Sequence, residues 1–354
     1  MKYDLMCIGT AIVDSIIRGF DPEPISASGF RAESGSLNVG GEAVNEAMAA
    51  AKLGLRTGIL CHLGEDAAGD MIASALMSCG VDTSSAVRSA EHPTPVTTMF
   101  VKEDGTRKSI TNGSHRYNFH PEQYPERFLD ARAISLGSLF RAPFDDPGII
   151  RETIRPAHEK GLLVLADTKL PNFKKLTLDD LNEVLPMIDY IFPNEDEARY
   201  YTGREEPQEM ADVFLSKGIK NVIIKLGAKG CYFRNEKEEI RLDACRIHAV
   251  DATGAGDNFI AGFAAGLLTG TQGTAPDSSI AAGLGNMTAE TFSETAKTPL
   301  SHGNILRFAN ACGAICASAV GAAAGLRSRE QVLEFLEGQN QALLSADTPF
   351  MNKK

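Results

Sequence analysis

Short apolar segments alternate with amphipathic helical stretches along most of the 354 residues. Apolar runs with so few polar interruptions are typical of strands buried on both faces of a parallel sheet. The four clearest span residues 133–136, 162–166, 190–192 and 221–225, and residues 1–9 are typical of a further strand. The alternation predicts an α/β fold: a doubly wound, mostly parallel sheet flanked by helices. Such sheets bind ligands beyond the carboxyl ends of their strands.

Two segments depart from this alternation of strands and helices, because their patterns predict short strands joined by turns. They span about residues 10–39 and 95–116, and the second carries Asp104-Gly105, a hairpin signal. We expect both to form a small β lid over a single domain, residues 1–354. A third irregular stretch, residues 271–303, is rich in small and polar residues. Its length predicts a mobile surface insertion.

Composition places the chain among soluble globular proteins, with 43% hydrophobic and 23% charged residues. No uninterrupted apolar stretch approaches the roughly 20 residues of a membrane span, and the N-terminus lacks the features of a secretion signal. We therefore expect a cytoplasmic protein without a membrane partner. The net charge of −11 argues against a nucleic-acid partner, because phosphate backbones need clustered Lys and Arg. The seven cysteines, without a C-x-x-C pair, are typical of buried reduced thiols.

The most informative motif is DATGAGD, residues 251–257, which leads directly into an apolar helix. A helix start leaves backbone amides without partners and favours anions, and glycines there allow close approach. An acid in the same turn would contact a hydroxyl beside that anion. The motif predicts phosphoryl transfer to an alcohol, with Asp257 as general base and the amides of Gly254, Ala255 and Gly256 as anion hole. On its own, Asp257 would only complement the helix dipole.

A second glycine pair, Gly40 and Gly41, also opens a helix. Asn45 in the first turn of that helix can donate to and accept from a sugar hydroxyl. Asp14, which follows the first strand, can bind two vicinal hydroxyls. A double glycine before a helix is weak evidence alone, so these residues only indicate where an acceptor would bind.

Two further turns follow predicted strands. Asn194 precedes a run of acids that includes Glu197, and this pattern is also that of an ordinary helix cap. The sequence KLGAKG, residues 225–230, reads as a turn whose backbone borders a nucleotide. Both turns lie where a doubly wound sheet binds its ligands.

Taken together, these four elements resemble the ribokinase-like carbohydrate kinases of the PfkB family, from the first strand to the helix near Phe308. Residues 251–257 resemble the C-terminal signature of the family, with Ala252 where Thr is frequent. Gly40-Gly41 with Asn45 resembles the N-terminal signature. The resemblance implies an ATP- and Mg²⁺-dependent kinase that phosphorylates a primary hydroxyl of a sugar or sugar acid.

The resemblance also implies roles for single residues. Asp257 is the base, with Gly254, Ala255 and Gly256 as anion hole; Asp14, Gly40, Gly41 and Asn45 bind the acceptor; Asn194, Glu197, Lys225, Gly227, Gly230 and Asn310 bind the nucleotide. Glu197 belongs to an N-x-x-E motif that orders Mg²⁺ through water, and Asp251 resembles the K⁺ ligand of some members. Lys225 replaces a frequent Thr, so its ammonium would reach the phosphates. A homodimer formed through the lid is an expectation from relatives.

Several alternatives accompany this hypothesis. A nucleoside kinase of the same fold stays open, because Arg107, Lys108 and Arg116 near the lid do not decide between acidic and neutral acceptors. The segment DTKLPN, residues 167–172, only partly resembles its family counterpart. A non-catalytic sugar- or nucleotide-binding regulator would have no use for the base Asp257. A nicotinamide dehydrogenase and a P-loop enzyme are excluded, because neither G-x-G-x-x-G nor G-x-x-x-x-G-K-[ST] is present.

Overall fold

The computed structural model describes residues 1–19, 31–102, 104, 106–112, 121–269, 300–322 and 324–346. The predicted insertion at 271–303 lies outside these described residues apart from its end, as do parts of both predicted lid segments. Among the described helices, none has the length and apolar character that a bilayer span demands.

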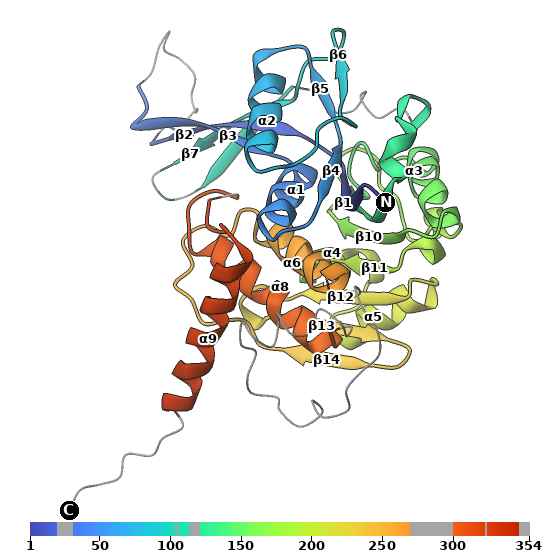
Figure 1. Cartoon of the computed structure of the whole chain (residues 1–354), viewed down its shortest axis with the longest axis vertical. Helices are drawn as coiled ribbons and strands as arrows, with labels where there is room; N and C mark the ends of the chain where they lie inside the picture. Colours follow the sequence, from blue (N-terminus) through green and yellow to red (C-terminus); the bar gives the residue numbers. More distant parts are fainter. Residues whose placement is uncertain are drawn as a thin grey trace, which may run out of the picture.

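An eight-stranded sheet forms the centre of the molecule, in the order β14-β13-β12-β11-β10-β9-β1-β4 (Figure 1). The strands from β12 to β4 run parallel, whereas β13 and β14 extend the sheet antiparallel. Their bounds are Tyr3–Ile8 (β1), Thr57–Leu60 (β4), Ala131–Leu139 (β9), Leu163–Thr168 (β10), Tyr190–Phe192 (β11), Asn221–Lys225 (β12), Cys231–Asn235 (β13) and Glu239–Leu242 (β14). All five strands predicted from the sequence lie in its parallel part. The predicted α/β class is confirmed.

Helices cover both faces of this sheet (Figure 1). Helices α1, α6 and α8 bury apolar residues on one face, and α3, α4 and α5 do so on the other. The bounds are Glu42–Lys52 (α1), Ala67–Ser78 (α2), Pro147–Glu159 (α3), Glu195–Thr202 (α4), Pro207–Ser216 (α5), Ala255–Thr269 (α6), His302–Ala317 (α8) and Arg329–Ala346 (α9). Strands buried between two helical layers explain why the predicted runs are almost continuously apolar.

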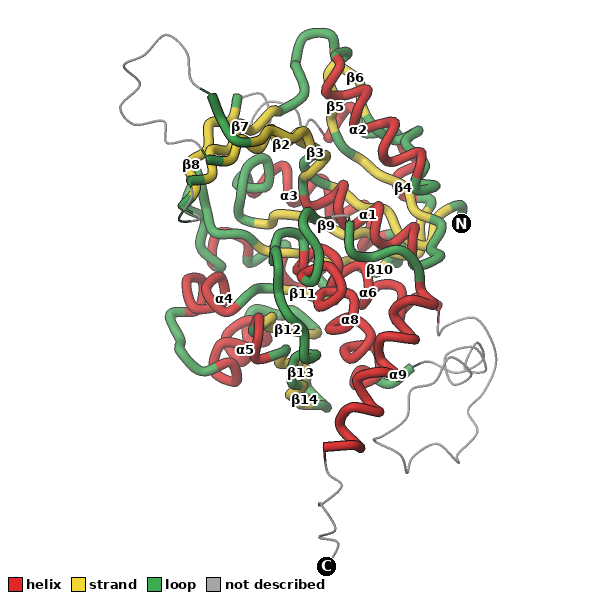
Figure 2. Tube along the Cα trace, turned by 90° about the vertical axis from the view of Figure 1, so that its left-hand side faces the viewer, coloured by secondary structure: helices red, strands yellow, loops and turns green. Residues whose placement is uncertain are grey.

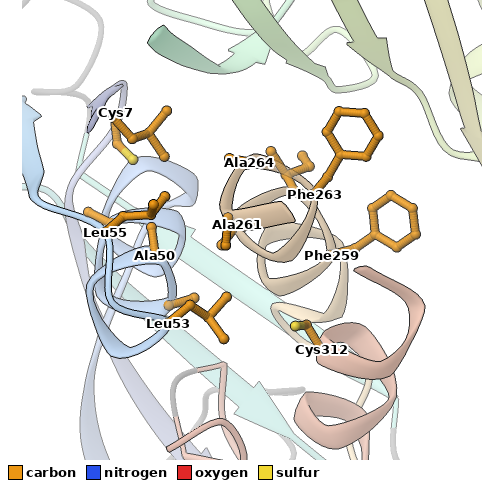
Figure 3. Packing of buried hydrophobic residues seen from close by; sticks show 14 of the residues in the cluster. Cys7, Ala50, Leu53, Leu55, Phe259, Ala261, Phe263, Ala264 and Cys312 are labelled. Atoms are coloured by element: carbon orange, nitrogen blue, oxygen red, sulfur yellow. The ribbon is translucent and has the colours of Figure 1, made fainter. Parts of the chain in front are cut away.

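Small residues let α6 pack closely between α1 and α8 (Figure 3). Ala261 of α6 is buried in the same cluster as Ala50 of α1 and Leu53, which directly follows α1. On the side of α8, a Cβ at Gly262 would lie 2.7 Å from the Cys312 Sγ, so a larger residue would push the helices apart. This packing fixes the starts of α1 and α6 relative to each other, and both starts carry predicted site residues.

A second sheet has four strands in the order β3-β2-β7-β8 and projects from the body of the molecule (Figures 1 and 2). Its bounds are Ile12–Arg18 (β2), Ser34–Gly40 (β3), Val96–Val101 (β7) and Arg107–Thr111 (β8), and a small further sheet pairs His62–Gly64 (β5) with Val87–Ser89 (β6). The outer strands β3 and β8 are mostly exposed. These strands occupy the two segments predicted to hold short strands and a hairpin. The function of this second sheet as a lid stays a prediction.

Candidate active site

A cleft of about 870 Å³ lies where the parallel strands β9 to β12 end, bordered by the second sheet and by the starts of α1 and α6. It is lined by ten of the predicted site residues: Asp14, Gly41, Asn45, Asn194, Lys225, Gly227, Gly254, Ala255, Gly256 and Asp257. Among these lining residues, those predicted to bind an acceptor come from β2 and the start of α1, and those predicted to bind a nucleotide come from the ends of β11 and β12. Both groups therefore meet in one cavity.

The backbone before α6 adopts a conformation that requires glycine. Gly254 has a φ of 76°, and a Cβ there would lie 2.4 Å from the Cβ of Ala322. Within the described part, the amides of Gly254 and Gly256 have no protein acceptor, whereas the Ala255 amide donates to the Ala252 carbonyl at 3.2 Å. Two of the three amides predicted for the anion hole are thus available to a ligand in this structure.

Asp257 lies in the first turn of α6 and is only 5% exposed. Asn45 Nδ2 donates a hydrogen bond of 2.7 Å to its Oδ2, which links α6 to α1. Burial raises the pKa of Asp257 to about 6, and the ammonium of Lys169 is the largest influence that opposes this rise. A carboxylate with a pKa just below neutrality is mostly ionised at pH 7 and accepts a proton more readily than an ordinary aspartate.

An ion-pair network centred on the buried Asp167 lies beside Asp257. Asp167, at the end of β10, is fully buried, and its carboxylate lies 2.6 Å from Lys225 Nζ and 3.3 Å from Lys169 Nζ. Lys169 also lies 4.0 Å from Glu42 Oε1. Burial would raise the pKa of Asp167, but Lys225 and Lys169 outweigh it and the pKa is lowered. A Cβ at Gly256 would lie 3.3 Å from Lys225 Nζ, so this ammonium is next to the free amides.

Asn194 and Glu197 form a capping box at the start of α4. The Asn194 side chain accepts a hydrogen bond of 2.9 Å from the Glu197 amide, and Glu197 Oε2 accepts bonds from the Asn194 amide at 2.9 Å and from Thr168 Oγ1 at 2.8 Å. Glu197 is 3% exposed and does not line the cleft, whereas Asn194 does. Both residues therefore act as an ordinary helix cap. Their contacts with a nucleotide stay predictions.

A family model described as "pfkB family carbohydrate kinase" matches residues 2–329. The chain belongs to this pfkB family. It is a carbohydrate kinase, that is, a phosphotransferase with an alcohol group as acceptor, as the sequence predicts.

Curated relatives of this kinase are similar over most of their length. The 2-dehydro-3-deoxygluconokinase of Bacillus subtilis is 27% identical over 319 residues, which cover 86% of this chain and 88% of the relative. The ribokinase of Arabidopsis thaliana is 28% identical over 346 residues, with coverages of 94% and 81%.

Solved structures place the kinase in the ribokinase-like fold. The structure of Arabidopsis thaliana ribokinase with ribose and ATP has a TM-score of 0.77 and 26% identity, and covers 95% of this chain and 99% of that chain. A ribokinase-type protein from E. coli in complex with ATP and Mg²⁺ has a TM-score of 0.71 and 21% identity, with coverages of 95% and 99%. The second likeness supports the fold alone.

Two of the residues predicted to bind the acceptor are glycines at the junction of β3 and α1, close to Asp14. Burial raises the pKa of Asp14, and the nearby Glu42 carboxylate adds to this effect. A Cβ at Gly40 would lie 2.6 Å from Asp14 Oδ2, so Gly40 packs against the Asp14 carboxylate and does not itself line the cleft. Gly41 has a φ of 97°, and a Cβ there would lie 2.3 Å from the Thr10 carbonyl oxygen. Backbone packing therefore requires glycine at position 41, whereas a side chain at position 40 would displace the Asp14 carboxylate.

Three other predicted residues lie away from the cleft lining. Gly230 allows a tight turn, because a Cβ there would lie 2.0 Å from the carbonyl oxygen of Leu242. Asn310 on α8 donates a long hydrogen bond of 3.4 Å to the Asp243 carbonyl. The carboxylate of Asp251 accepts hydrogen bonds from two backbone amides in neighbouring turns. Their predicted contacts with nucleotide and K⁺ stay predictions.

Sequence reasoning assigned no role to Lys169 and Glu46. Glu46 is fully buried and accepts a hydrogen bond of 2.5 Å from Ser135 Oγ. Its carboxylate forms a group with those of Asp167 and Asp257, whose oxygens lie within 4.8 Å of one another. Burial raises the pKa of Glu46 well above its usual range, which favours the neutral acid. An acidic residue inside an Ala-rich helix is the signal that could have identified it.

Proposed function

We propose that this kinase transfers the γ-phosphoryl group of ATP to a hydroxyl of a sugar or sugar acid, with Asp257 as general base. The observation that carries the proposal is the position of Asp257, which lines the cleft in the same helical turn as the free amide of Gly256. Relatives named 2-dehydro-3-deoxygluconokinase and ribokinase support a sugar acid and a sugar as acceptor classes.

Three side chains would hold and activate the acceptor. Asp14 and Asn45 offer hydrogen-bonding groups to its hydroxyls. Asn45 engages one oxygen of Asp257, which leaves the other to accept the hydroxyl proton. As that proton moves to Asp257, the hydroxyl oxygen bonds to the γ-phosphorus, and the bond between this phosphorus and the β–γ bridging oxygen breaks. ADP then leaves with the electron pair of the broken bond.

The charge that develops on the transferred group would be stabilised by the start of α6. The free amides of Gly254 and Gly256 are the backbone donors, and Lys225 adds an ammonium next to Gly256. Asp167 holds this ammonium in place through the 2.6 Å contact. Preorganised donors of this kind supply most of the catalysis in phosphoryl transfer. We propose further that the second sheet acts as a lid that excludes water.

Mg²⁺ would neutralise phosphate charge when it is bound with the nucleotide. The Glu197 carboxylate would offer this ion a hard oxygen of the kind it prefers. Glu197 is buried, and its oxygens already accept hydrogen bonds from Asn194 and Thr168, so it fits an indirect role through ordered water. A K⁺ ion at Asp251 and a homodimer through the second sheet remain predictions from the resemblance.

A panel of acceptors tests the proposal. Purified enzyme with ATP and Mg²⁺ is incubated with sugars, sugar acids and nucleosides, and both ADP release and the phosphorylated product are measured. We expect acceptor-dependent ADP release with sugars or sugar acids. Activity with nucleosides alone would favour a nucleoside kinase of the same fold, and binding without turnover would favour a non-catalytic regulator.

A further inference from the structure

The loop that follows β9 borders the acceptor half of the cleft. In the large sheet β9 lies between β10 and β1, whereas the predicted nucleotide residues follow β11 and β12. A Cβ at Gly9, after β1, would lie 3.4 Å from the Gly137 carbonyl oxygen, and a Cβ at Gly137 would lie 3.1 Å from the Cβ of Glu42. The end of β9 is therefore packed against the elements that lead to Asp14 and Asn45.

Among the described residues, three cationic side chains line the cleft: Arg141 in this loop, Lys169 and Lys225. The two lysines are held by Asp167, and Lys169 also by Glu42. Within the described residues, by contrast, the Arg141 guanidinium has neither an ion pair nor a side-chain hydrogen bond. Its charge is thus available to a ligand, although the cleft also contains carboxylates.

The turn that carries Arg141 has unusual backbone conformations and is anchored by a buried aromatic side chain. Ser138 and Phe140 have φ values of 68° and 74°, in the left-handed region that non-glycine residues rarely adopt. Phe140 is fully buried and stacks on Tyr201, with ring centroids 4.1 Å apart. Such conformations cost free energy and persist where the surrounding structure enforces them, often at functional sites.

Further hydrogen bonds join this turn to the loop after β10. The Ala142 amide donates to Asn172 Oδ1 at 3.2 Å, and the Lys169 amide donates to the Leu139 carbonyl at 3.0 Å. Within the turn, the Arg141 amide donates to the Ser138 carbonyl at 3.0 Å. The loops after β9 and β10 are therefore joined by hydrogen bonds, which hold the backbone of Arg141 at the cleft.

We propose that Arg141 binds an anionic oxyacid group of the acceptor, so that the kinase prefers acceptors carrying a carboxylate or a phosphate ester. This inference rests on the proposed function. The planar guanidinium matches both groups through two parallel hydrogen bonds, and neutral sugars offer no equivalent partner. The anionic group is separate from the hydroxyl that Asp257 deprotonates, because the reacting hydroxyl must lie beside that carboxylate.

The test compares kcat/KM for three related acceptors: a hexonic acid, a hexose 6-phosphate and the neutral hexose. The variants are Arg141→Met, Arg141→Lys and, as a control, Arg204→Met, which removes an exposed arginine after α4. We expect the parent to prefer an anionic acceptor and Arg141→Met to lower the anionic-to-neutral ratio by about 10- to 100-fold, mostly through KM. Arg141→Lys should restore part of the ratio, and Arg204→Met should match the parent. The two anionic acceptors distinguish a carboxylate from a phosphate ester.

Other results would overturn the inference. A parent that turns over only the neutral hexose would reject the anion preference and leave the proposed function intact. An unchanged ratio in Arg141→Met would remove Arg141 from the site. If no acceptor in the panel releases ADP, the proposed function fails, and this inference fails with it. Melting temperatures show whether each variant is folded, and Arg141 is exposed, so no core packing is lost.

Discussion

At the scale of single residues, the ionisation of Asp257 reflects opposing influences from several elements. Burial raises its pKa to about 6, and the carboxylates of Glu42 and Asp167 add to that rise. Lys169 and the hydrogen bond from Asn45 oppose it. The result is a carboxylate that is mostly deprotonated at neutral pH but retains substantial proton affinity, as the proposed general base requires.

The pH profile of kcat/KM should show this pKa. Because the base must be deprotonated to accept the hydroxyl proton, kcat/KM should be level above about pH 7 and fall through an apparent pKa of about 6. Initial rates between pH 5 and pH 8, in buffers of about equal ionic strength, would measure it. A profile that stays flat down to about pH 5 would contradict the assignment of Asp257.

Lys169 should determine the pH at which kcat/KM falls, which is the acid limb of the profile. Replacement by Met in Lys169→Met removes the cation that lowers the pKa of Asp257 most, so the limb should move to higher pH and activity at pH 7 should drop. Lys160→Met, at the exposed end of α3, is the matched control and should keep the parent profile. A limb that stays in place in Lys169→Met would show that this charge does not act on Asp257.

The sequence predicts Asp257 and Asn45 because each lies in a glycine-rich motif at a helix start. It does not predict their direct hydrogen bond, because the two residues are 212 positions apart and meet only through packing of α1 on α6. Lys169 and Glu46 stayed unassigned for the same reason. Their importance depends on neighbours from other strands and helices, which no local pattern reveals.

At the scale of elements, the start of α6 depends on one backbone conformation. Gly254 has a φ of 76° and touches Ala322, so a side chain there would be strained and would also collide with backbone atoms. A displaced turn would move the free amides and Asp257 together. The geometry of the proposed anion hole therefore depends on this glycine.

A comparison of Gly254→Ala with Gly161→Ala should separate two effects: the collision of a new Cβ with Ala322 and the backbone strain of a positive φ. Gly161 has a similar φ of 77°, but a Cβ there would meet nothing within 4 Å. The control should lose only about 1–2 kcal/mol of unfolding free energy, the usual cost of a left-handed alanine. Gly254→Ala should lose more, and its kcat should fall by more than about tenfold. Denaturant unfolding and initial rates measure both, and equal effects in the two variants would contradict this account.

The predicted elements differ in how well the sequence reveals them. Strands β9 to β12 are evident, because burial on both faces gives continuous apolar runs. The order of the strands and the antiparallel addition of β13 and β14 are set by contacts distant in sequence, so no local pattern predicts them. Gly40 and Gly230 stay predicted ligand contacts, but each also has a packing role, against the Asp14 side chain for Gly40 and against the Leu242 carbonyl for Gly230.

At the scale of the whole molecule, the cleft lies between two sheets. Asp14 and Thr97 line it from the second sheet, whereas Lys225 and Asp257 line it from the large sheet side. Closure of the second sheet over bound substrates would bring the acceptor residues and the base together. This motion is part of the proposed lid function.

Hydrogen exchange tests the lid. With the acceptor and a non-hydrolysable ATP analogue each at about 100 times Kd, amides of β2 and β7 should exchange up to about 100-fold more slowly than in the free enzyme. Amides of the hairpin β13–β14 serve as reference and should slow less. Equal slowing in both regions would indicate general stabilisation and would argue against a lid.

The central claim is that Asp257 accepts the proton of the attacking hydroxyl, and Asp257→Asn tests it most directly. We expect kcat to fall by about 10²- to 10⁴-fold, while calorimetric Kd values for ATP and acceptor change by less than about threefold. Glu46→Gln is the matched control, because Glu46 is buried in the same cluster, burial raises its pKa and favours the neutral form that Gln resembles, and the variant should keep most turnover. If Asp257→Asn retains turnover within about tenfold of the parent, the account of this site is wrong.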